Sequence, residues 1–182
     1  MISYSGERVR LRPLRRSDAE TSVVWRNDPV IRENLLGYRF PVTEKMEEKW
    51  FESALDDQSR LRVVFAIETI EDAVLIGFIN LNQIDWIAKN CYFGISIGNK
   101  KYHGKGLAPE SMRIMFRYAF DCLNLRKICL EVATFNNNAV ALYNKFGFVE
   151  EGLLKEHIYL EGKYHDVILM RIFDHEFRNK YK

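Results

Sequence analysis

A glycine-rich segment between a predicted strand and a predicted helix carries the residue types best suited to chemistry. It reads His103-Gly104-Lys105-Gly106-Leu107-Ala108. The glycines let the backbone approach a ligand closely. The first amide groups of the following helix have no partners inside it, and the positive end of the helix dipole adds to them. With Lys105 beside these donors, the segment predicts a binding site for a diphosphate.

Two common phosphate-binding motifs do not fit this segment. A Walker A loop requires the pattern G-x-x-x-x-G-K-[ST], which the sequence lacks. A dinucleotide-binding loop, G-x-G-x-x-G, would need a third glycine where Pro109 stands. The diphosphate therefore belongs to another kind of ligand.

A second polar segment follows an apolar run, residues 128–133, which we interpret as a buried strand. It reads Asn136-Asn137-Asn138-Ala139-Val140-Ala141-Leu142-Tyr143-Asn144-Lys145-Phe146-Gly147-Phe148. Asparagine is a good helix cap, and glycine is a common residue directly after a helix. We therefore expect a helix that begins after Asn136 and ends at Gly147.

The two segments together resemble a known family. The first is similar to the [Q/R]-x-x-G-x-[G/A] acetyl-CoA loop of the GNAT acetyltransferases, with His103 where that family usually has Gln or Arg. The second is similar to the N-x-x-[S/A]-x-x-L-Y-x-K-x-G-F helix of the same family. Residues 11–14, residues 25–29 and the closing hairpin also look like the branch that acetylates ribosomal-protein N-termini, polyamines and nucleotide-sugar amines. The resemblance therefore covers nearly the whole chain.

The expected fold is α+β, because predicted strands and helices interleave without strict alternation. This order favours a mixed, mostly antiparallel sheet with helices on both faces. The resemblance implies the GNAT fold with about seven strands, in which the strand before the glycine segment and the strand before Asn136 splay apart around the pantetheine arm of acetyl-CoA. With 182 residues, 47% of them hydrophobic, and no linker or repeat, we expect a single domain spanning residues 1–182.

Two N-terminal elements are predicted from periodicity. Residues 9–14 alternate apolar and basic side chains, which indicates a strand with one face in water. A helix after Thr43 would bury a stripe made of Met46, Trp50, Ala54 and Leu55.

The resemblance also implies which residues bind the co-substrate acetyl-CoA. They are Ile95, Ser96, Ile97, His103, Gly104, Lys105, Gly106, Leu107, Ala108, Asn136 and Lys145. Asn136 would hold the pantetheine amides, or act only as a helix cap. For the oxyanion, the resemblance implies a backbone amide within residues 94–96.

Acetyl transfer from a thioester to an amine requires a proton to leave the amine, donors for the oxyanion and a proton for the thiolate. The resemblance places the hydroxyl of Tyr143 near the sulfur, so we interpret Tyr143 as the general acid. The alternative is one more aromatic side chain on a core-facing helix. The general base stays open among Glu131, Asp85, Tyr92 and a chain of waters.

Residues 124–170 most resemble spermidine N-acetyltransferases, so a polyamine is the first candidate acceptor. Its ammonium groups require carboxylates, which Glu33, Glu44, Glu47 and Glu48 would supply unless they form a solvated helical face. The expected acceptor contacts are Trp25, Glu33, Tyr38 and Tyr92.

Arg39 opposes a polyamine, because it would repel an ammonium group and attract a phosphate. The sequence Trp25-Arg26-Asn27 also occurs in acetyltransferases of 4-amino nucleotide sugars, which makes such a sugar the second candidate and a protein N-terminus the third. From a different class, the chain would be a non-catalytic acyl-CoA-binding module. Tyr143 beside an intact glycine segment argues against that alternative.

The bulk composition excludes several other classes. The formal net charge is +2, from 27 basic and 25 acidic side chains, so we expect neither nucleic acid nor a membrane surface as partner. The three cysteines lack CxxC spacing, and no leader or long apolar run is evident, which predicts a cytoplasmic protein. The histidines lack metal-ligand spacing, so no metal is expected. Relatives commonly pair or form rings, so a homo-oligomer is an open alternative.

Overall fold

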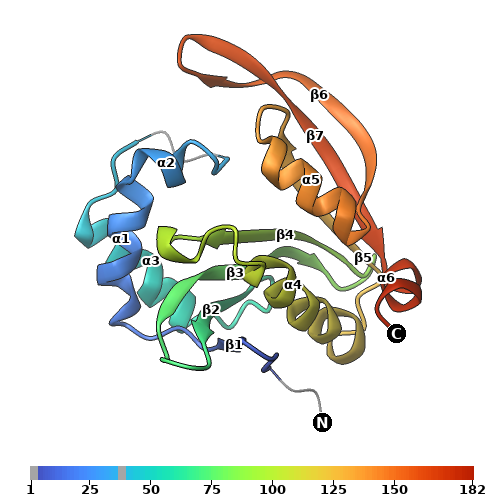
Figure 1. Ribbon diagram of the computed structural model, residues 1–182, viewed down its shortest axis with the longest axis horizontal. Coiled ribbons are helices and arrows are strands. Elements are labelled where there is room, and N and C mark those ends of the chain that lie inside the picture. Colours follow the sequence, from blue (N-terminus) through green and yellow to red (C-terminus); the bar gives the residue numbers. More distant parts are fainter. Residues whose placement is uncertain (1–3, 37–39) are drawn as a thin grey trace.

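The computed structural model describes residues 4–36 and 40–182, and over this part of the chain strands and helices interleave as the sequence predicts (Figure 1). One sheet takes the strand order β1-β2-β3-β4-β5-β7-β6. Its strands are β1 (Val9–Arg12), β2 (Val63–Thr69), β3 (Leu75–Asp85), β4 (Asn90–Ile97), β5 (Lys127–Ala133), β6 (Val149–Leu160) and β7 (Lys163–Phe173). The α-helices are α1 (Asp18–Asn27), α2 (Pro29–Arg32), α3 (Glu44–Leu55), α4 (Leu107–Arg117), α5 (Asn137–Phe146) and α6 (Asp174–Lys180).

Every neighbouring pair of strands is antiparallel except β4 and β5, which are parallel. The predicted α+β class with a mostly antiparallel sheet of about seven strands is therefore confirmed.

Both faces of the sheet are covered, as its alternating side chains require. On β2, Ala66 packs with Phe51 of α3 in a small cluster on one face. The next residue, Ile67, belongs to the larger core on the other face, which α4 and α5 supply with Phe116 and Phe146. Two neighbouring residues on one strand thus serve two hydrophobic cores.

The sheet opens between β4 and β5. Their parallel pairing covers only Asn90–Lys127, Cys91–Ile128 and Tyr92–Cys129. Beyond these pairs β4 continues to Ile97 alongside β3, and β5 continues to Ala133 alongside β7. No strand among the described residues therefore pairs with the facing edges, residues 93–97 of β4 and 130–133 of β5, which confirms the predicted splay.

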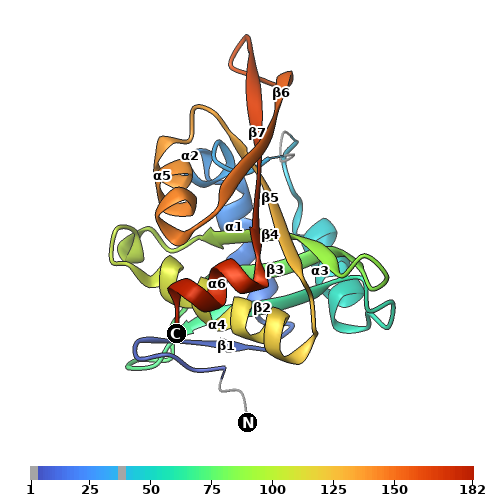
Figure 2. The ribbon, with the colours of Figure 1, turned by 90° about the vertical axis from the view of Figure 1, so that its right-hand side faces the viewer.

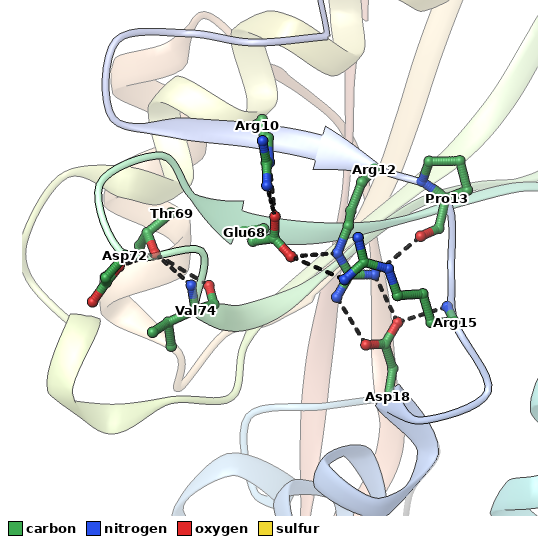
Figure 3. A network of polar contacts seen from close by, with 9 residues as sticks. All are labelled: Arg10, Arg12, Pro13, Arg15, Asp18, Glu68, Thr69, Asp72 and Val74. Atoms are coloured by element: carbon green, nitrogen blue, oxygen red, sulfur yellow. Dashed lines mark hydrogen bonds and ion pairs between the residues drawn. The ribbon is translucent and has the colours of Figure 1, made fainter.

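The prediction that β1 has one face in water holds at Arg10, whose side chain is 43% exposed, but not at Arg12, which is buried. Arg12 is 8% exposed and binds Asp18 with Nη1 and Nη2, at 2.9 and 2.8 Å, and Glu68 with Nε at 2.6 Å (Figure 3). Arg10 Nε donates to the same carboxylate of Glu68 at 2.7 Å. The basic positions of β1 face a buried carboxylate on β2, so they join β1, β2 and the start of α1.

The predicted buried stripe of α3 is wrong at two positions. Met46 and Leu55 are 54% and 40% exposed, while Glu47 and Phe51 are buried. Successive helical residues point about 100° apart, so the helix is turned by roughly one residue from the expected orientation. The cause is the polar partner that α1 offers to Glu47, described below.

The predicted closing hairpin is formed by β6 and β7, which extend beyond the rest of the molecule in both ribbon views (Figure 1 and Figure 2). His165 lies in β7 and packs edge-on against Phe135, with ring centroids 4.9 Å apart. Within the described ranges, no group of histidine, cysteine and carboxylate side chains is arranged to hold a metal ion. Nor does any helix there have the length and apolar character needed to cross a bilayer.

Candidate active site

A cavity of about 540 Å³ lies where β4 and β5 part. Its walls come from α1 and the residues after α2 on one side and from α5 on the other, with β3, β4 and β5 between them (Figure 1). The cavity brings together residues that are far apart in the sequence. Those among the predicted site residues that line it are Trp25, Tyr92, Ile95, Ser96, Asn136 and Tyr143.

Tyr143 projects into the cavity wall from α5. The helix begins where the Oδ1 atom of Asn136 accepts the Ala139 amide at 3.1 Å, and it ends at Gly147, whose φ of 116° is left-handed. Tyr143 is 9% exposed, and no residue in the described ranges hydrogen-bonds its hydroxyl. Burial raises the pKa of Tyr143 to about 12, so the phenol keeps its proton at neutral pH.

The glycine segment follows β4 through a short 3₁₀ turn, Lys100–Tyr102. Gly104 and Gly106 have φ values of 71° and 73°, in the left-handed region that glycine adopts at little cost. Gly106 caps α4 and has no side chain with which to occupy the first amides of that helix. These amides therefore form the open helix start that the sequence predicts.

His103 and Lys105 flank Gly104 in this segment. His103 Nε2 lies 2.7 Å from the carbonyl oxygen of Ile97, so the ring folds back onto β4. Lys105 is exposed, with its Nζ 5.1 Å from the centroid of the Tyr102 ring. The backbone, together with the Lys105 charge, is thus what the segment offers to an anion.

A family model described as an acetyltransferase (GNAT) domain matches residues 8–149. That range contains the glycine segment, the divergent strands and the helix that carries Tyr143. The chain belongs to the GNAT acetyltransferases.

Individual GNAT relatives are similar over most of the chain. A spermidine N(1)-acetyltransferase of Vibrio cholerae is 36% identical over 153 residues, covering 81% of this chain and 84% of the relative. A protein of the same name from Escherichia coli K12 is 30% identical over 178 residues, covering 98% and 92%. A solved structure of the Vibrio cholerae enzyme in complex with CoA and spermine has a TM-score of 0.85 and 31% identity, covering 94% of this chain and 98% of that one.

GNAT enzymes use acetyl-CoA, and the residues present here fit it. The start of α4 carries uncapped amides for a diphosphate. The unpaired edges of β4 and β5 offer main-chain groups to the amides of a pantetheine arm, and Tyr143 lies in the wall of the same cavity.

Residues 103–108 open α4 outside the cavity lining, and four further predicted GNAT site residues lie outside the cavity or outside the described ranges. Lys145 is exposed on α5, and its carbonyl oxygen accepts from Lys180 Nζ at 2.6 Å. Glu33 is exposed directly after α2, and Ile97 lies at the end of β4. Tyr38, like Arg39, falls outside the residues that the structure describes.

The geometry separates the candidates for the general base of this GNAT site. Glu131 and Tyr92 both line the cavity, from β5 and β4. Asp85 instead ends β3, where its Oδ1 accepts the amides of Ile87 and Ala88 at 2.9 and 2.8 Å. Asp85 stabilises a turn and does not line the cavity, so of the three side chains only Glu131 and Tyr92 do; a chain of waters stays open as the other candidate.

A buried carboxylate in the cavity wall, that of Glu47, has partners that the sequence analysis did not predict. Glu47 is 1% exposed and accepts from Ser22 Oγ at 2.6 Å with one oxygen and from Arg26 Nη1 at 2.5 Å with the other. Ser22 and Arg26 are four residues apart and so face the same side of α1. That spacing was the available signal for the partners of Glu47, which the sequence analysis instead expected to meet a polyamine or to lie on a solvated helical face.

Trp25 in the cavity wall packs directly over Gly98, a contact that the sequence analysis did not predict. A Cβ atom at Gly98 would lie 2.0 Å from the Trp25 ring, so the indole occupies the space of a side chain. Lys100 then pairs with Asp28 at 2.5 Å, just beyond the end of α1. The segment after β4 thereby fixes the position of α1.

Proposed function

We propose that this GNAT enzyme transfers the acetyl group of acetyl-CoA to a primary amine of a polyamine such as spermidine. The observation that carries the proposal is the cavity between the diverging β4 and β5, with Tyr143 in its wall. Two relatives named spermidine N(1)-acetyltransferases, and the similar fold of a structure in complex with CoA and spermine, support the polyamine as acceptor.

Acetyl-CoA would extend from the start of α4 into the cavity. The uncapped amides at the start of α4 would hold the diphosphate, with Lys105 adding a positive charge. The pantetheine arm would run along the free edge of β4, past Ile95 and Ser96. This path would bring the thioester toward Tyr143.

The chemistry then follows from groups in the cavity. The amine, after losing its proton, attacks the thioester carbonyl carbon, and a backbone amide within residues 94–96 stabilises the oxyanion. As the carbon–sulfur bond breaks, the hydroxyl of Tyr143 donates its hydrogen to the leaving sulfur. The ammonium proton lost before attack passes by way of Glu131, Tyr92 or water to the solvent. The second proton, lost from the nitrogen as the tetrahedral intermediate collapses, returns to the Tyr143 phenolate. The products are an N-acetylated amine, free CoA and one released proton.

Charges in the cavity are compatible with a cationic acceptor. The carboxylate of Glu47 is already paired with Arg26, whereas Glu131 makes no ion pair with any residue in the described ranges. The rings of Trp25, Trp50 and Tyr92 in the same wall offer cation–π contacts to ammonium groups.

A 4-amino nucleotide sugar is the second candidate, because amide side chains are abundant in the same wall. Asn34, Asn80, Asn82 and Gln83 line the cavity, and the Nδ2 atom of Asn82 donates to Asn80 at 2.6 Å. Amide groups both donate and accept, so they suit the hydroxyl groups of a sugar.

The test compares acceptors directly. Release of free thiol from acetyl-CoA is measured with spermidine, a 4-amino nucleotide sugar and a peptide with a free N-terminus, and kcat/KM is compared. The proposal expects spermidine to give the highest value, with N-acetylspermidine identified by mass. A higher value for the sugar would replace the polyamine. If acetyl-CoA binds and no amine accelerates thiol release, the chain is a binding module.

We also propose that the enzyme acts in the cytoplasm. This is supported by Cys91, Cys122 and Cys129, which are all free thiols, as is usual in a reducing compartment.

A further inference from the structure

We propose that Arg8 is a positioning residue for coenzyme binding, because it holds two carbonyl groups of the glycine segment on the side away from the diphosphate. The inference rests on the acetyl-CoA site of the proposed function and is independent of the acceptor. Arg8 directly precedes β1, nearly one hundred residues before the segment that it contacts.

The guanidinium of Arg8 donates hydrogen bonds to both carbonyl groups and also to the carboxylate of Glu110. Arg8 Nη1 donates to the carbonyl oxygen of Lys105 at 2.9 Å, and Nη2 donates to that of Gly106 at 3.2 Å. Its Nε donates to Glu110 Oε2 at 3.0 Å, within the first turn of α4. The planar donors of arginine can satisfy three acceptors in this way, which the single ammonium of lysine cannot match.

The geometry of the peptide bond turns these contacts into an orientation of amides. In a trans peptide the C=O and N–H groups point in opposite directions. Since the carbonyls of Lys105 and Gly106 point to Arg8, the amides of Gly106 and Leu107 point away from it. These amides open α4, so they face the side from which an anion would approach.

The glycines make such a restraint necessary. Gly104 and Gly106 adopt positive φ, and a glycine backbone rotates more freely than any other. A rotated peptide would present a carbonyl oxygen to the diphosphate and repel it. Arg8 opposes that rotation and also places a positive charge behind the loop.

Glu110 in turn fixes Arg8. It is 4% exposed, and its Oε1 accepts the backbone amides of Arg8 at 2.7 Å and of Val9 at 3.3 Å. Burial alone would raise the pKa of Glu110, but hydrogen bonds from the backbone and side chain of Arg8 outweigh it, so the pKa lies below its usual value. The carboxylate is therefore charged at neutral pH and pairs with the guanidinium.

The experiment separates binding of the coenzyme from the other steps. Arg8→Met should raise the KM and the calorimetric Kd for acetyl-CoA roughly tenfold, while kcat and the KM for the amine stay within about twofold. Arg8→Lys keeps the charge and should fall between wild type and Arg8→Met. Arg16→Met is the matched control, because Arg16 is exposed and reaches only Glu52, at 3.9 Å; it should leave all constants unchanged.

Two outcomes would overturn the proposal. One is an acetyl-CoA Kd for both Arg8 variants within twofold of wild type. The other is a parallel loss of kcat and of both KM values together with a lower melting temperature, which would indicate general damage. If no amine is acetylated by the wild type while the Kd for acetyl-CoA still responds to Arg8, the proposed acetylation fails and the positioning role stands.

Discussion

The phenol of Tyr143 is buried in the cavity wall, and burial raises its pKa to about 12, further above neutral pH than the ordinary value of about 10. A hydrogen donor is then always available to the leaving sulfur. Tyr143→Phe removes only the hydroxyl and should lower kcat by roughly 10²–10⁴-fold while the Kd for acetyl-CoA changes little. Steady-state kinetics and calorimetry check this.

A matched control for that substitution is Tyr159→Phe, since Tyr159 is 56% exposed on the projecting hairpin and lies outside the cavity. Turnover in the Tyr159 variant should equal that of wild type. Unchanged turnover in the Tyr143 variant would remove Tyr143 from the role of acid.

Single residues were predictable from the sequence where a local motif carries them. Tyr143 and Asn136 belong to one helix motif, and both line the cavity. Arg8 and Glu110 were missed because their contact spans 102 residues and neither belongs to a motif. Glu47 was named as a candidate carboxylate, but its burial against Ser22 and Arg26 was not predicted, because those partners lie on another helix.

Among the elements, α1 depends on the short connection that follows β4. Gly98→Ala would place a Cβ atom 2.0 Å from the Trp25 ring and displace that ring from the acceptor wall. Overpacking of this kind costs about 1–3 kcal/mol. We expect the KM for the amine to rise roughly tenfold, with the Kd for acetyl-CoA changed less than twofold.

The control is Gly152→Ala, because a Cβ atom there would meet only the Leu169 side chain, at 3.6 Å. That variant should have wild-type kinetics. An equal rise in the Kd for acetyl-CoA and the KM for the amine in the Gly98 variant would contradict the proposal. Gly98 would then not act by positioning Trp25 in the acceptor part of the cavity.

The existence of elements was predicted better than their orientation. Periodicity found α3, but Met46 faces solvent because the partners of Glu47 lie on α1. In the same way β1 was predicted, but Arg12 is buried because Glu68 on β2 and Asp18 on α1 accept its hydrogen bonds. Orientation depends on partners distant in sequence, which the local pattern does not contain.

For the molecule as a whole, the network around Glu68 connects the sheet edge to the first helix (Figure 3). Burial alone would raise the pKa of Glu68, but hydrogen bonds from Arg12 and Arg10 outweigh it and the pKa lies below its usual value of 4.5. The stabilisation is therefore complete above about pH 4.5 and is lost as the pH falls through the lowered pKa.

Glu68→Gln should reduce the free energy of unfolding at pH 7 by about 3 kcal/mol, because it removes the charge that Arg12 and Arg10 face. The difference from wild type should shrink as the pH falls below about 4.5. Denaturant melts at pH 7 and pH 4 measure both effects. Glu150→Gln, at an exposed position on β6, should have no comparable effect. A difference independent of pH would show that Glu68 acts by packing rather than by charge.

We propose that the whole chain forms one domain, since a single sheet takes strands from Val9 to Phe173. The mixed sheet and its splay were predictable because the family motifs fix the order of strands around them. The polar lining of the acceptor side was not, since it is assembled from several elements.

Only three residue pairs join β4 to β5. Because a bound coenzyme would lie between the unpaired parts of both strands, it would stabilise the sheet at this junction. Amides of residues 93–97 and 130–133 that face the gap should exchange their hydrogens with solvent readily in the free protein, and saturation with CoA should slow that exchange severalfold or more. Mass-spectrometric exchange with and without CoA measures it, and equal rates in both states would contradict the idea. The concentration of coenzyme would then also determine how tightly the part of the sheet ending at β4 is held to the part beginning at β5.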